Sequence, residues 1–398
     1  MNINDLNFFL SFGYFPCQSK SVENYFDEKV YLSSLDESYE SLVVNAKNNF
    51  LEQLSCNLTN KKNIVPLSGG MDSRAILAGL LQVTSASSIE TFTYGTKGCM
   101  DYEIGPAVAK GLGVINSAYD LGSYELNYEE LIARSIAVGK QTEIMHCPPV
   151  LLLGNAYKEN TVWSGVMGDI VAGSVGSILN PKNIGAKKYL EGKMIDANGF
   201  FSGKNLEFYS KKLIKNNKLF KLVGDKEGYL FTDRLNGYYM PIIGCGAGNI
   251  ITPFLNDKIL SMFFAGRIKE PKQGQFYRDF LRLLDKKAFS YPLKNNFGYG
   301  LDAGYLNVMT GRLLRKIKVT FGSGVDPSIN YFDFSMKMNN DASFNFLIKD
   351  LLVSFKKRNI DIDLNWPDIF ENISSNKNST LIKRIISIEI HFQNGLAV

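Results

Sequence analysis

The sequence predicts an α/β fold in which a parallel sheet carries helices on both faces. Short runs of apolar residues have the composition of buried strands, and segments with helical spacing of apolar residues separate them. Because consecutive parallel strands need a crossover, usually a helix, this alternation is typical of a Rossmann-like sheet. From about residue 226 to residue 398 the pattern is mainly helical, so we expect a helical region beside the sheet.

The predicted elements alternate along the first half of the chain. Strands are expected at residues 63–67, 89–94 and 161–164, where apolar and β-branched residues cluster. Helices are expected at residues 36–54, from the end of the first strand to Leu81, and at residues 103–112, 125–138 and 149–157. Residues 1–35, rich in aromatic residues and turn formers, are expected to be irregular. We therefore divide the chain into an N-terminal segment (1–55), a sheet domain (56–300) and a mainly helical C-terminal extension (301–398).

The overall composition is typical of a soluble globular protein. Hydrophobic residues make up 45% and charged residues 21% of the 398 residues, and the formal net charge is +5. This mild positive charge suits an anionic ligand and does not indicate nucleic-acid binding. The N-terminus lacks a signal-peptide pattern, and no apolar run approaches the length of a membrane span. We expect a cytoplasmic protein without a membrane span.

The cysteines and histidines narrow the possible chemistry. The five cysteines are scattered without a CxxC pair, which argues against a structural zinc site and favours reduced thiols. The only two histidines are His146 and His391, so a Ser-His-Asp triad or a two-histidine metal site would draw on distant parts of the chain. We expect both to be ordinary packed or surface residues. A basic stretch at residues 180–221 is expected to be a solvated helical face.

The string Ser-Gly-Gly-Met-Asp-Ser at residues 68–73 follows the first predicted strand and opens a helix. Two glycines let the backbone approach a ligand closely, and the N–H groups at a helix N-terminus bind anions. Ser68 and Ser73 add hydroxyl donors. Asp72 fits a phosphate-binding loop only if a cation such as Mg²⁺ bridges it to the phosphate. The Walker sequence GxxxxGK[ST] is absent, so this is a different kind of phosphate loop.

Residues 66–73 resemble the PP-loop of the ATP pyrophosphatases, enzymes that split ATP into AMP and pyrophosphate. Within that superfamily the chain is most similar to the synthetase domain of asparagine synthetase, with its relatives β-lactam synthetase and the lasso-peptide cyclases. The resemblance covers roughly residues 50–300 and rests on four motifs in the same order. It implies that residues 56–300 form an ATP pyrophosphatase domain of the asparagine-synthetase type.

A similar strand and the other three motifs follow the loop along the chain. Residues 91–95 are similar to the strand that holds adenine in that family. Ser164-Gly165 followed by Gly168-Asp169 resembles the segment whose serine and glycine touch the nucleotide and whose aspartate is the second Mg²⁺ ligand. Thr252-Pro-Phe-Leu resembles an element of the family's helical half, and residues 277–298 are similar to the stretch that carries the active-site lysine.

The resemblance assigns a role to each candidate site residue. Lys294 is the expected catalytic residue, stabilising charge on the α-phosphate, and Asp72 and Asp169 are the expected Mg²⁺ ligands. Residues expected to contact ATP are Leu67, Ser68, Gly69, Gly70, Asp72, Ser73, Thr93, Tyr94, Gly95, Ser164 and Gly165.

The implied reaction is ATP-dependent amide formation with ATP and Mg²⁺ as cofactors. A substrate carboxylate attacks the α-phosphate, pyrophosphate leaves, and an amine displaces AMP from the acyl-adenylate. The expected partners are a small-molecule, sugar-acid or peptide carboxylate, and ammonia or another amine.

Three departures from the family pattern change the expected substrates. Residue 2 is Asn, so the N-terminal cysteine of the family's glutaminase domain is missing, and ammonia would come free or from a separate glutaminase. Val166 stands where the family has a glutamate or a tyrosine, and Asn249 and Ile251 replace a glutamate and an arginine. We therefore expect a carboxylate other than free aspartate.

Two alternatives stay open, and a third lacks support. The chain could make asparagine from aspartate with external ammonia, or it could be a nucleotide-binding pseudoenzyme, as Val166 and Asn249 suggest. Intact Asp72, Asp169 and Lys294 argue against the pseudoenzyme. tRNA thiolation also uses a PP-loop, but the cysteine pairs or strongly basic region typical of those enzymes are not evident.

Overall fold

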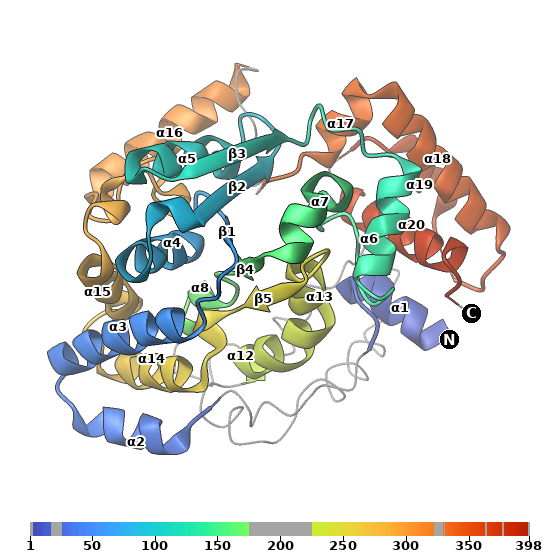
Figure 1. Cartoon of the computed structure of the whole chain (residues 1–398). Helices are drawn as coiled ribbons and strands as arrows, with labels where there is room; N and C mark the ends of the chain where they lie inside the picture. The colour runs from blue at the N-terminus through green and yellow to red at the C-terminus, as the bar shows by residue number, and fades with distance from the viewer. Residues whose placement is uncertain are drawn as a thin grey trace.

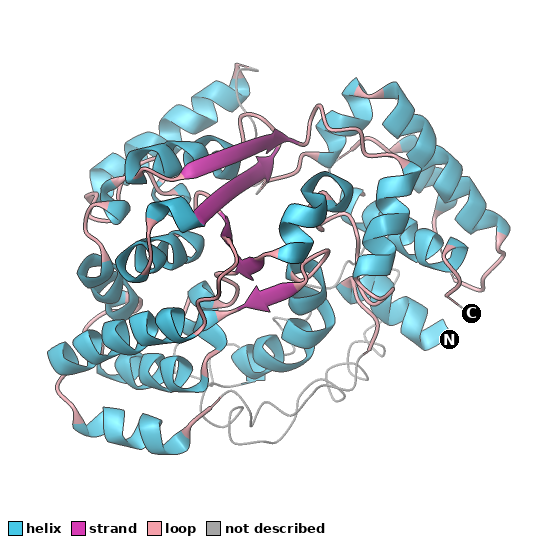
Figure 2. Cartoon of the chain, in the orientation of Figure 1, coloured by secondary structure: helices cyan, strands magenta, loops and turns pink. Residues whose placement is uncertain are grey.

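The sheet of this protein is parallel throughout, as the sequence predicts. The computed structural model describes residues 3–16, 26–174, 225–321, 329, 331–362, 364–375 and 378–396, so the basic stretch at residues 180–221 lies outside the described residues. A five-stranded sheet has the order β3-β2-β1-β4-β5, and every neighbouring pair is parallel (Figures 1 and 2). Its strands are β1 (Asn63–Pro66), β2 (Ile89–Gly95), β3 (Ile115–Asp120), β4 (Thr161–Trp163) and β5 (Asn249–Ile251).

The direction in which successive strands are added to the sheet reverses between β1 and β4. Both of these strands are buried. Asn63 of β1 lies opposite Ile89 of β2 on one side and Thr161 of β4 on the other. An order of 3-2-1-4-5 in a parallel sheet creates a switch point, where the crossovers leave in opposite directions and open a crevice at the carboxyl ends of the strands. The β1 and β4 turns meet at this point.

Two strands were not predicted, and both lie at the edges of the sheet. β3 has mostly exposed or half-exposed residues, so it lacks the apolar run that marks a central strand. β5 is only three residues long and follows a glycine-rich turn. The three predicted strands are confirmed as β1, β2 and β4.

Helices cover both faces of the sheet. On one face Val65 and Trp163 share a buried cluster with α3 (Tyr39–Cys56), α4 (Asp72–Val83) and α5 (Met100–Leu112). On the other face Ile64, Phe92 and Val162 pack against Leu153 and Tyr157 of α7 (Val150–Glu159). Successive side chains of each short strand therefore point to opposite faces and contact the helices on both, as in a three-layer α/β sandwich.

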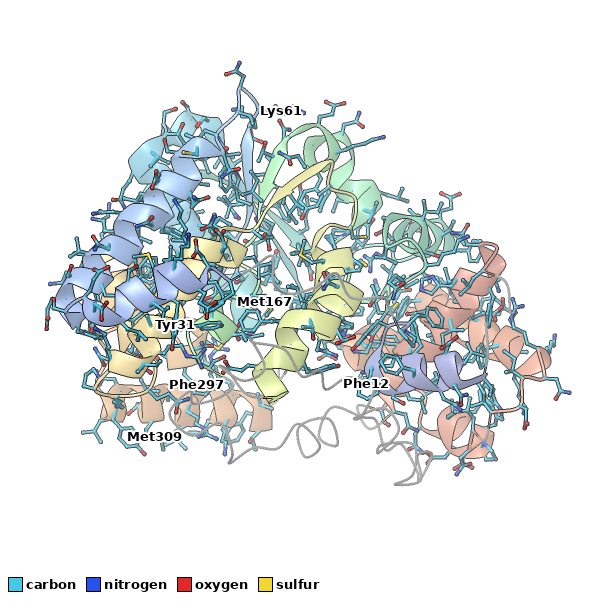
Figure 3. The ribbon with its side chains drawn as sticks, turned by 90° about the horizontal axis from the view of Figure 1, so that it is seen from below. Phe12, Tyr31, Lys61, Met167, Phe297 and Met309 are labelled. Carbon is cyan, nitrogen blue, oxygen red and sulfur yellow. The ribbon has the colours of Figure 1, made fainter. Side chains whose placement is uncertain are left out.

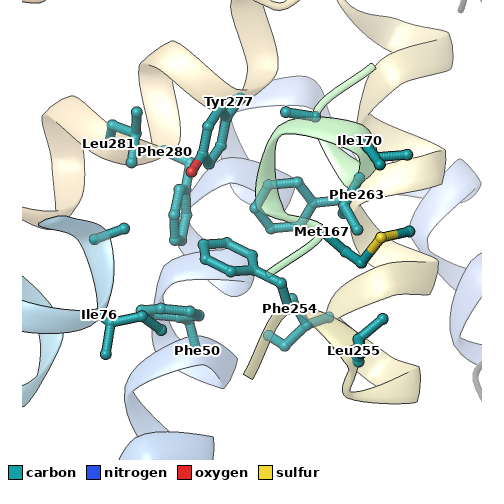
Figure 4. Close-up of a cluster of buried hydrophobic side chains, with 14 of the residues drawn as sticks. Phe50, Ile76, Met167, Ile170, Phe254, Leu255, Phe263, Tyr277, Phe280 and Leu281 are labelled. Atoms are coloured by element: carbon teal, nitrogen blue, oxygen red, sulfur yellow. The ribbon is translucent and has the colours of Figure 1, made fainter. Parts of the chain in front are cut away.

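An aromatic cluster joins the helical half of the chain to this core (Figure 4). Phe50 of α3 lies 5.3 Å from Phe254, measured between ring centroids, and 5.3 Å from Phe280 of α15 (Gln275–Leu284). Phe263 of α14 (Asp257–Lys269) lies 5.1 Å from Phe280. Edge-to-face aromatic packing of this kind fixes the orientation of α15, and with it the position of Tyr277.

The expectation that residues 1–35 are irregular was wrong. The described part of this segment forms α1 (Ile3–Phe12) and α2 (Glu28–Asp36). α1 is apolar on most sides and buries Phe8, Phe9 and Leu10, so it lacks the polar face that makes a helix recognisable in sequence. It packs against the C-terminal helix α20 (Ser379–Gln393), and the two chain ends lie near each other in Figure 1.

The mainly helical character of residues 226–398 is confirmed in the described part of the chain. The remaining elements are α6 (Tyr128–Ala137), α8 (Gly168–Val171), α12 (Asp225–Tyr229), a π-helix η4 (Leu230–Tyr239), α13 (Met240–Ile243), α16 (Tyr305–Thr320), α17 (Phe334–Asn340), α18 (Ala342–Lys357) and α19 (Trp366–Glu371), with short 3₁₀ turns at Ala86–Ser88, Pro253–Leu255, Ala288–Ser290 and Lys294–Asn296. Among the residues described, no helix is long and apolar enough to cross a membrane.

His391 is an ordinary packed residue, as expected. It is fully buried on α20, and its two ring nitrogens lie 2.8 Å from Ser135 Oγ and 2.9 Å from the Thr142 carbonyl oxygen. His146 is half-buried at the wall of a cavity that residues of η4, α13 and α20 also line.

Candidate functional site

The turns after β1 and β4 lie side by side at the switch point of the sheet. The first turn begins where the Leu67 N–H donates to the Phe92 carbonyl at 2.8 Å, and it continues through residues 68–73 into α4. The second runs from Ser164 to Asp169 and begins where the Ser164 N–H donates to the Ile251 carbonyl at 2.8 Å. Both turns are extensions of central strands, so the sheet fixes their positions.

The β1 turn is held by its own polar groups. The Ser73 hydroxyl accepts a hydrogen bond from the Ser68 N–H at 3.2 Å and lies 3.1 Å from the Ser68 hydroxyl. The Ser68 Oγ also accepts from the Gly70 N–H at 3.2 Å. The turn thus arranges backbone N–H groups and two hydroxyls in one small concavity, which is the composition of an anion-binding loop.

The expected metal ligands Asp72 and Asp169 lie together. The Asp169 N–H donates to Asp72 Oδ2 at 3.0 Å, and the Tyr277 hydroxyl donates to Asp72 Oδ1 at 2.6 Å. Burial, with the charge of the nearby Asp169, raises the pKa of Asp72 to about 7. Burial also raises the pKa of Asp169. Two neighbouring carboxylates with raised pKa values are an incompletely compensated cluster of negative charge.

Glycines allow the second turn to approach Asp72 this closely. A Cβ on Gly165 would lie 2.7 Å from the Asp72 carbonyl carbon, and one on Gly168 would lie 2.7 Å from the Asp72 carboxyl carbon. Between them, Met167 takes a left-handed backbone conformation with φ of 68°. Any side chain at either glycine would push the two carboxylates apart.

The expected catalytic residue Lys294 contacts the same turn, although it lies more than two hundred residues further along the chain. Its ammonium donates to Asp101 Oδ2 at 2.7 Å, while Asp101 Oδ1 accepts from the Gly69 N–H at 3.0 Å. The Lys294 backbone N–H donates to the Gly69 carbonyl at 2.8 Å. Gly69 has no room for a Cβ, which would lie 3.2 Å from Lys294 Cβ and 3.0 Å from the Met100 carbonyl oxygen. Asp101 therefore orients both the lysine and the glycine turn.

A buried arginine fixes the segment that carries Lys294. The Arg74 guanidinium, on the first turn of α4, donates to the carbonyl oxygens of Ala288, Tyr291 and Pro292 at 2.6–3.2 Å. Burial lowers the pKa of Arg74 to about 10, still well above neutrality, so the group stays charged. Charge-assisted hydrogen bonds to three carbonyls hold residues 288–292 next to the β1 turn.

Thr93, Tyr94 and Gly95, the residues expected to contact adenine, have different surroundings. The Thr93 hydroxyl donates to the Leu67 carbonyl at 2.8 Å, so that side chain supports the sheet. Tyr94 borders a cavity of about 110 Å³ that Ser68, Asp101 and Tyr331 also line. Gly95 lies at the end of β2, where a Cβ would lie 3.0 Å from the Tyr331 carbonyl oxygen. The cavity is small and accommodates part of a ligand.

The residues present fit a bound Mg²⁺. No group of three or more His, Cys, Asp or Glu side chains suited to a metal occurs in the part of the chain that the structure describes. Mg²⁺ does not need one, because it is usually held by one or two carboxylates together with phosphate oxygens and water. Asp72 and Asp169 supply two carboxylates at the edge of the β1 turn. Burial raises the pKa of both, so a bound cation would stabilise their charged forms.

The positions that lack the family's acidic groups have structural roles here. The Val166 N–H donates to Ser164 Oγ at 3.2 Å within the β4 turn. The Asn249 side chain donates to Thr161 Oγ1 at 3.3 Å and links β5 to β4. Neither side chain could act as a base.

The sequence did not single out Asp101, Arg74 or Tyr277 as site residues. Asp101 and Tyr277 contact predicted site residues, and Arg74 contacts the segment just before Lys294. Each contact joins residues about two hundred positions apart, as in the Tyr277 hydrogen bond to Asp72. A weak signal existed for Arg74, a charged residue directly before the apolar run of residues 75–81. A charged residue on a buried helix face requires a partner.

Comparisons with known proteins add nothing to this geometry. No protein-family model matches the chain, and no curated protein matches it significantly. The likeness to asparagine synthetase therefore stays a prediction based on the four motifs.

We predict that Gly168→Ala weakens binding of Mg²⁺-ATP by about tenfold or more, because the added methyl displaces the Asp72 carboxylate. Binding of a fluorescent ATP analogue in the presence of Mg²⁺ measures this. The matched control is Gly304→Ala, where a Cβ meets nothing within 4 Å and φ is negative. Equal affinities for the two variants would contradict the assignment of Asp72.

Proposed function

We propose that this protein is an ATP-dependent carbon–nitrogen ligase that activates a carboxylate as an acyl-adenylate and transfers the acyl group to an amine. The observation that supports it most is the convergence of two carboxylates and a lysine on one glycine-rich turn at the switch point of a parallel sheet. Asp72 and Asp169 come from the β1 and β4 turns, and Lys294 comes from a segment more than two hundred residues further along than Asp72.

The first step joins two anions, so electrostatics dominate it. The substrate carboxylate oxygen forms a bond to the α-phosphorus, and the bond from that phosphorus to the bridging oxygen of pyrophosphate breaks. Bound Mg²⁺, held by Asp72 and Asp169, would neutralise charge on the departing pyrophosphate. The N-terminus of α4, which follows the β1 turn, and the Ser68 and Ser73 hydroxyls would orient the phosphates.

Lys294 supplies the positive charge at the reacting phosphate. An ammonium has three N–H bonds, so Lys294 keeps its hydrogen bond to Asp101 and still donates to an α-phosphate oxygen. The Asp101 contact and the Arg74 anchor of residues 288–292 hold this charge in place before ATP arrives. Such preorganisation is usually the largest single contribution to catalysis of this kind.

In the second step the amine nitrogen attacks the acyl carbon, AMP leaves, and the nitrogen loses a proton. Asn249 and Val166 cannot accept that proton, which favours an amine or ammonia that arrives uncharged, or a base outside these two positions. The carboxylate is best sought among sugar acids and peptide side chains. We retain Mg²⁺ and ATP as the cofactors and a cytoplasmic location as part of this proposal.

A pyrophosphate-release assay with Mg²⁺-ATP tests the proposal directly. A panel of carboxylates is supplied with hydroxylamine, which converts an acyl-adenylate into a detectable hydroxamate. We expect release to depend on one class of carboxylate and to produce hydroxamate. ATP binding without release across a broad panel would support the pseudoenzyme instead.

We predict that Lys294→Ala lowers pyrophosphate release by about 10²–10³-fold, the usual effect of losing one preorganised donor. ATP affinity should change by about threefold or less, because the turn and the two carboxylates still bind the phosphates. Lys286→Ala removes an exposed lysine from the same region and serves as the control. Near-normal release by Lys294→Ala would exclude the lysine from the mechanism.

A further inference from the structure

A cavity of about 550 Å³ lies beside the candidate site and has no role in the reaction described so far. Its volume is in the range of pockets that bind small molecules. Tyr331 lines both this cavity and the small one next to Ser68, so the two are neighbours. The Tyr331 carbonyl accepts from the Thr96 N–H at 2.6 Å, which fixes it to the end of β2. A ligand here would lie next to the nucleotide turn.

The walls of the cavity are mostly aromatic and aliphatic, with a few polar groups. The apolar part consists of Tyr238, Tyr239, Ile242, Ile243, Ile329, Tyr331, Phe332 and Phe334. The polar part consists of His146, Asp333, Ser379, Thr380 and Lys383. Aromatic walls with a few polar groups are the usual composition of a site that binds a ring or an aliphatic body and orients it by hydrogen bonds.

Lys383 is the most unusual of these groups. Its side chain is only 8% exposed, yet among the described residues its ammonium forms no hydrogen bond or ion pair. The Lys383 ammonium nitrogen lies over the face of the Phe334 ring, 5.9 Å from the ring centroid. Burial lowers the pKa of Lys383, an effect that the Glu143 charge partly offsets. A buried ammonium without a partner destabilises the fold, and a bound anion that paired with it would offset this effect.

The helix that carries Lys383 adds a second anion-binding feature. Ser379 and Thr380, at the N-terminus of α20, line the same cavity one turn before the lysine. Asn378, which precedes the helix, does not cap it, because its side-chain amide donates to Asp368 instead. The N-terminus of a fifteen-residue helix and an unpaired ammonium therefore face one space.

We propose that this cavity binds the acyl substrate through a second anionic group, a carboxylate or a phosphate, that pairs with Lys383. The ring or aliphatic body of the substrate packs against the aromatic walls. Asp333, whose Oδ1 accepts from the Met336 N–H, offers its other oxygen to a hydroxyl or amine of the ligand. This inference rests on the proposed function for the identity of the ligand, whereas the anion site itself does not.

Three probes test the anion site: phenylacetate, glucuronate and glucose 6-phosphate, each titrated by calorimetry. They compare a simple aromatic acid, a sugar acid and a sugar phosphate. We expect at least one to bind wild-type protein and to bind Lys383→Gln about tenfold more weakly or worse. Lys349→Gln, an exposed lysine of α18, should bind like wild type. Failure of all three probes to bind, or equal binding to wild type and Lys383→Gln, would overturn the inference.

Further measurements distinguish a failure of the anion-site inference from a failure of the proposed function. The unfolding midpoint of Lys383→Gln should equal or exceed that of wild type, since the substitution removes an unpaired buried charge. A fluorescent ATP analogue should bind this variant normally. Lys294→Ala should keep its affinity for the probes. Wild-type protein that binds the probes through Lys383 but releases no pyrophosphate with any carboxylate would defeat only the proposed function.

A second, independent feature is the exposed apolar face of α16. Gly311 is the only buried residue of this sixteen-residue helix, and it packs where a Cβ would lie 2.7 Å from the Phe297 carbonyl oxygen. The exposed large apolar side chains are Tyr305, Leu306, Met309, Leu313, Leu314, Ile317 and Phe321. Figure 3 shows Met309 at the rim of the molecule, pointing away from the rest of the ribbon. Soluble proteins rarely expose so continuous an apolar stripe without a partner.

The charges beside this stripe indicate the partner. Residues 303–321 contain Arg312, Arg315, Lys316 and Lys318 but no Asp or Glu. A helix with one apolar face, basic flanks and no acidic residues has the composition of a helix that lies in the interface of an anionic bilayer. We infer that α16 docks the protein on an anionic membrane surface, with its apolar side chains among the lipid headgroups.

Vesicle sedimentation tests the membrane inference. Wild-type protein should sediment about tenfold more with vesicles containing phosphatidylglycerol than with phosphatidylcholine alone, and salt should weaken this binding. Leu313→Glu should lower it about tenfold, whereas Phe346→Glu, at an exposed position of α18, should not. No sedimentation with anionic vesicles, or a dimer in light scattering that Leu313→Glu dissociates, would overturn it.

Discussion

The hydrogen bond from the Asp169 N–H to the Asp72 carboxylate is the contact on which the site depends. It joins the turns after β1 and β4 across the switch point of the sheet and brings two carboxylates together. Burial, together with the charge of Asp169, raises the pKa of Asp72 and disfavours its charged form. Gly165 and Gly168 stand at positions where a side chain would prevent this approach, and the Tyr277 hydroxyl donates to the other carboxylate oxygen. The surroundings therefore maintain a local concentration of negative charge that a divalent cation would relieve.

The helical half of the chain completes this site rather than standing apart from it. Tyr277 comes from α15, whose position is set by its packing against Phe50 and Phe263. Arg74 donates to three carbonyl groups in residues 288–292, and Lys294 follows directly. Because these contacts are buried and charge-assisted, movement of the helical half would displace Lys294 from the β1 turn. The packing of the helical half therefore determines the geometry of the site.

Sequence patterns were sufficient for the central sheet and for the residues in its two turns. β1, β2 and β4 are buried on both sides, so their apolar runs identify them, and the turns follow directly. β3 was not predicted because an edge strand with an exposed face needs no apolar run. α1 was not predicted because a helix that is buried on most sides has no polar face. Asp101 and Tyr277 could not be predicted as partners, because nothing local records contacts between residues about two hundred positions apart.

The account rests on the claim that Asp72 and Asp169 hold a cation against the phosphates of ATP. The most direct test is the affinity of an ATP analogue measured with Mg²⁺ and with EDTA, in wild type and in Asp169→Asn. We predict that Mg²⁺ raises the affinity of wild type about tenfold or more and that Asp169→Asn loses most of this gain. An affinity that is the same with Mg²⁺ and with EDTA, or a gain that survives in Asp169→Asn, would contradict the claim.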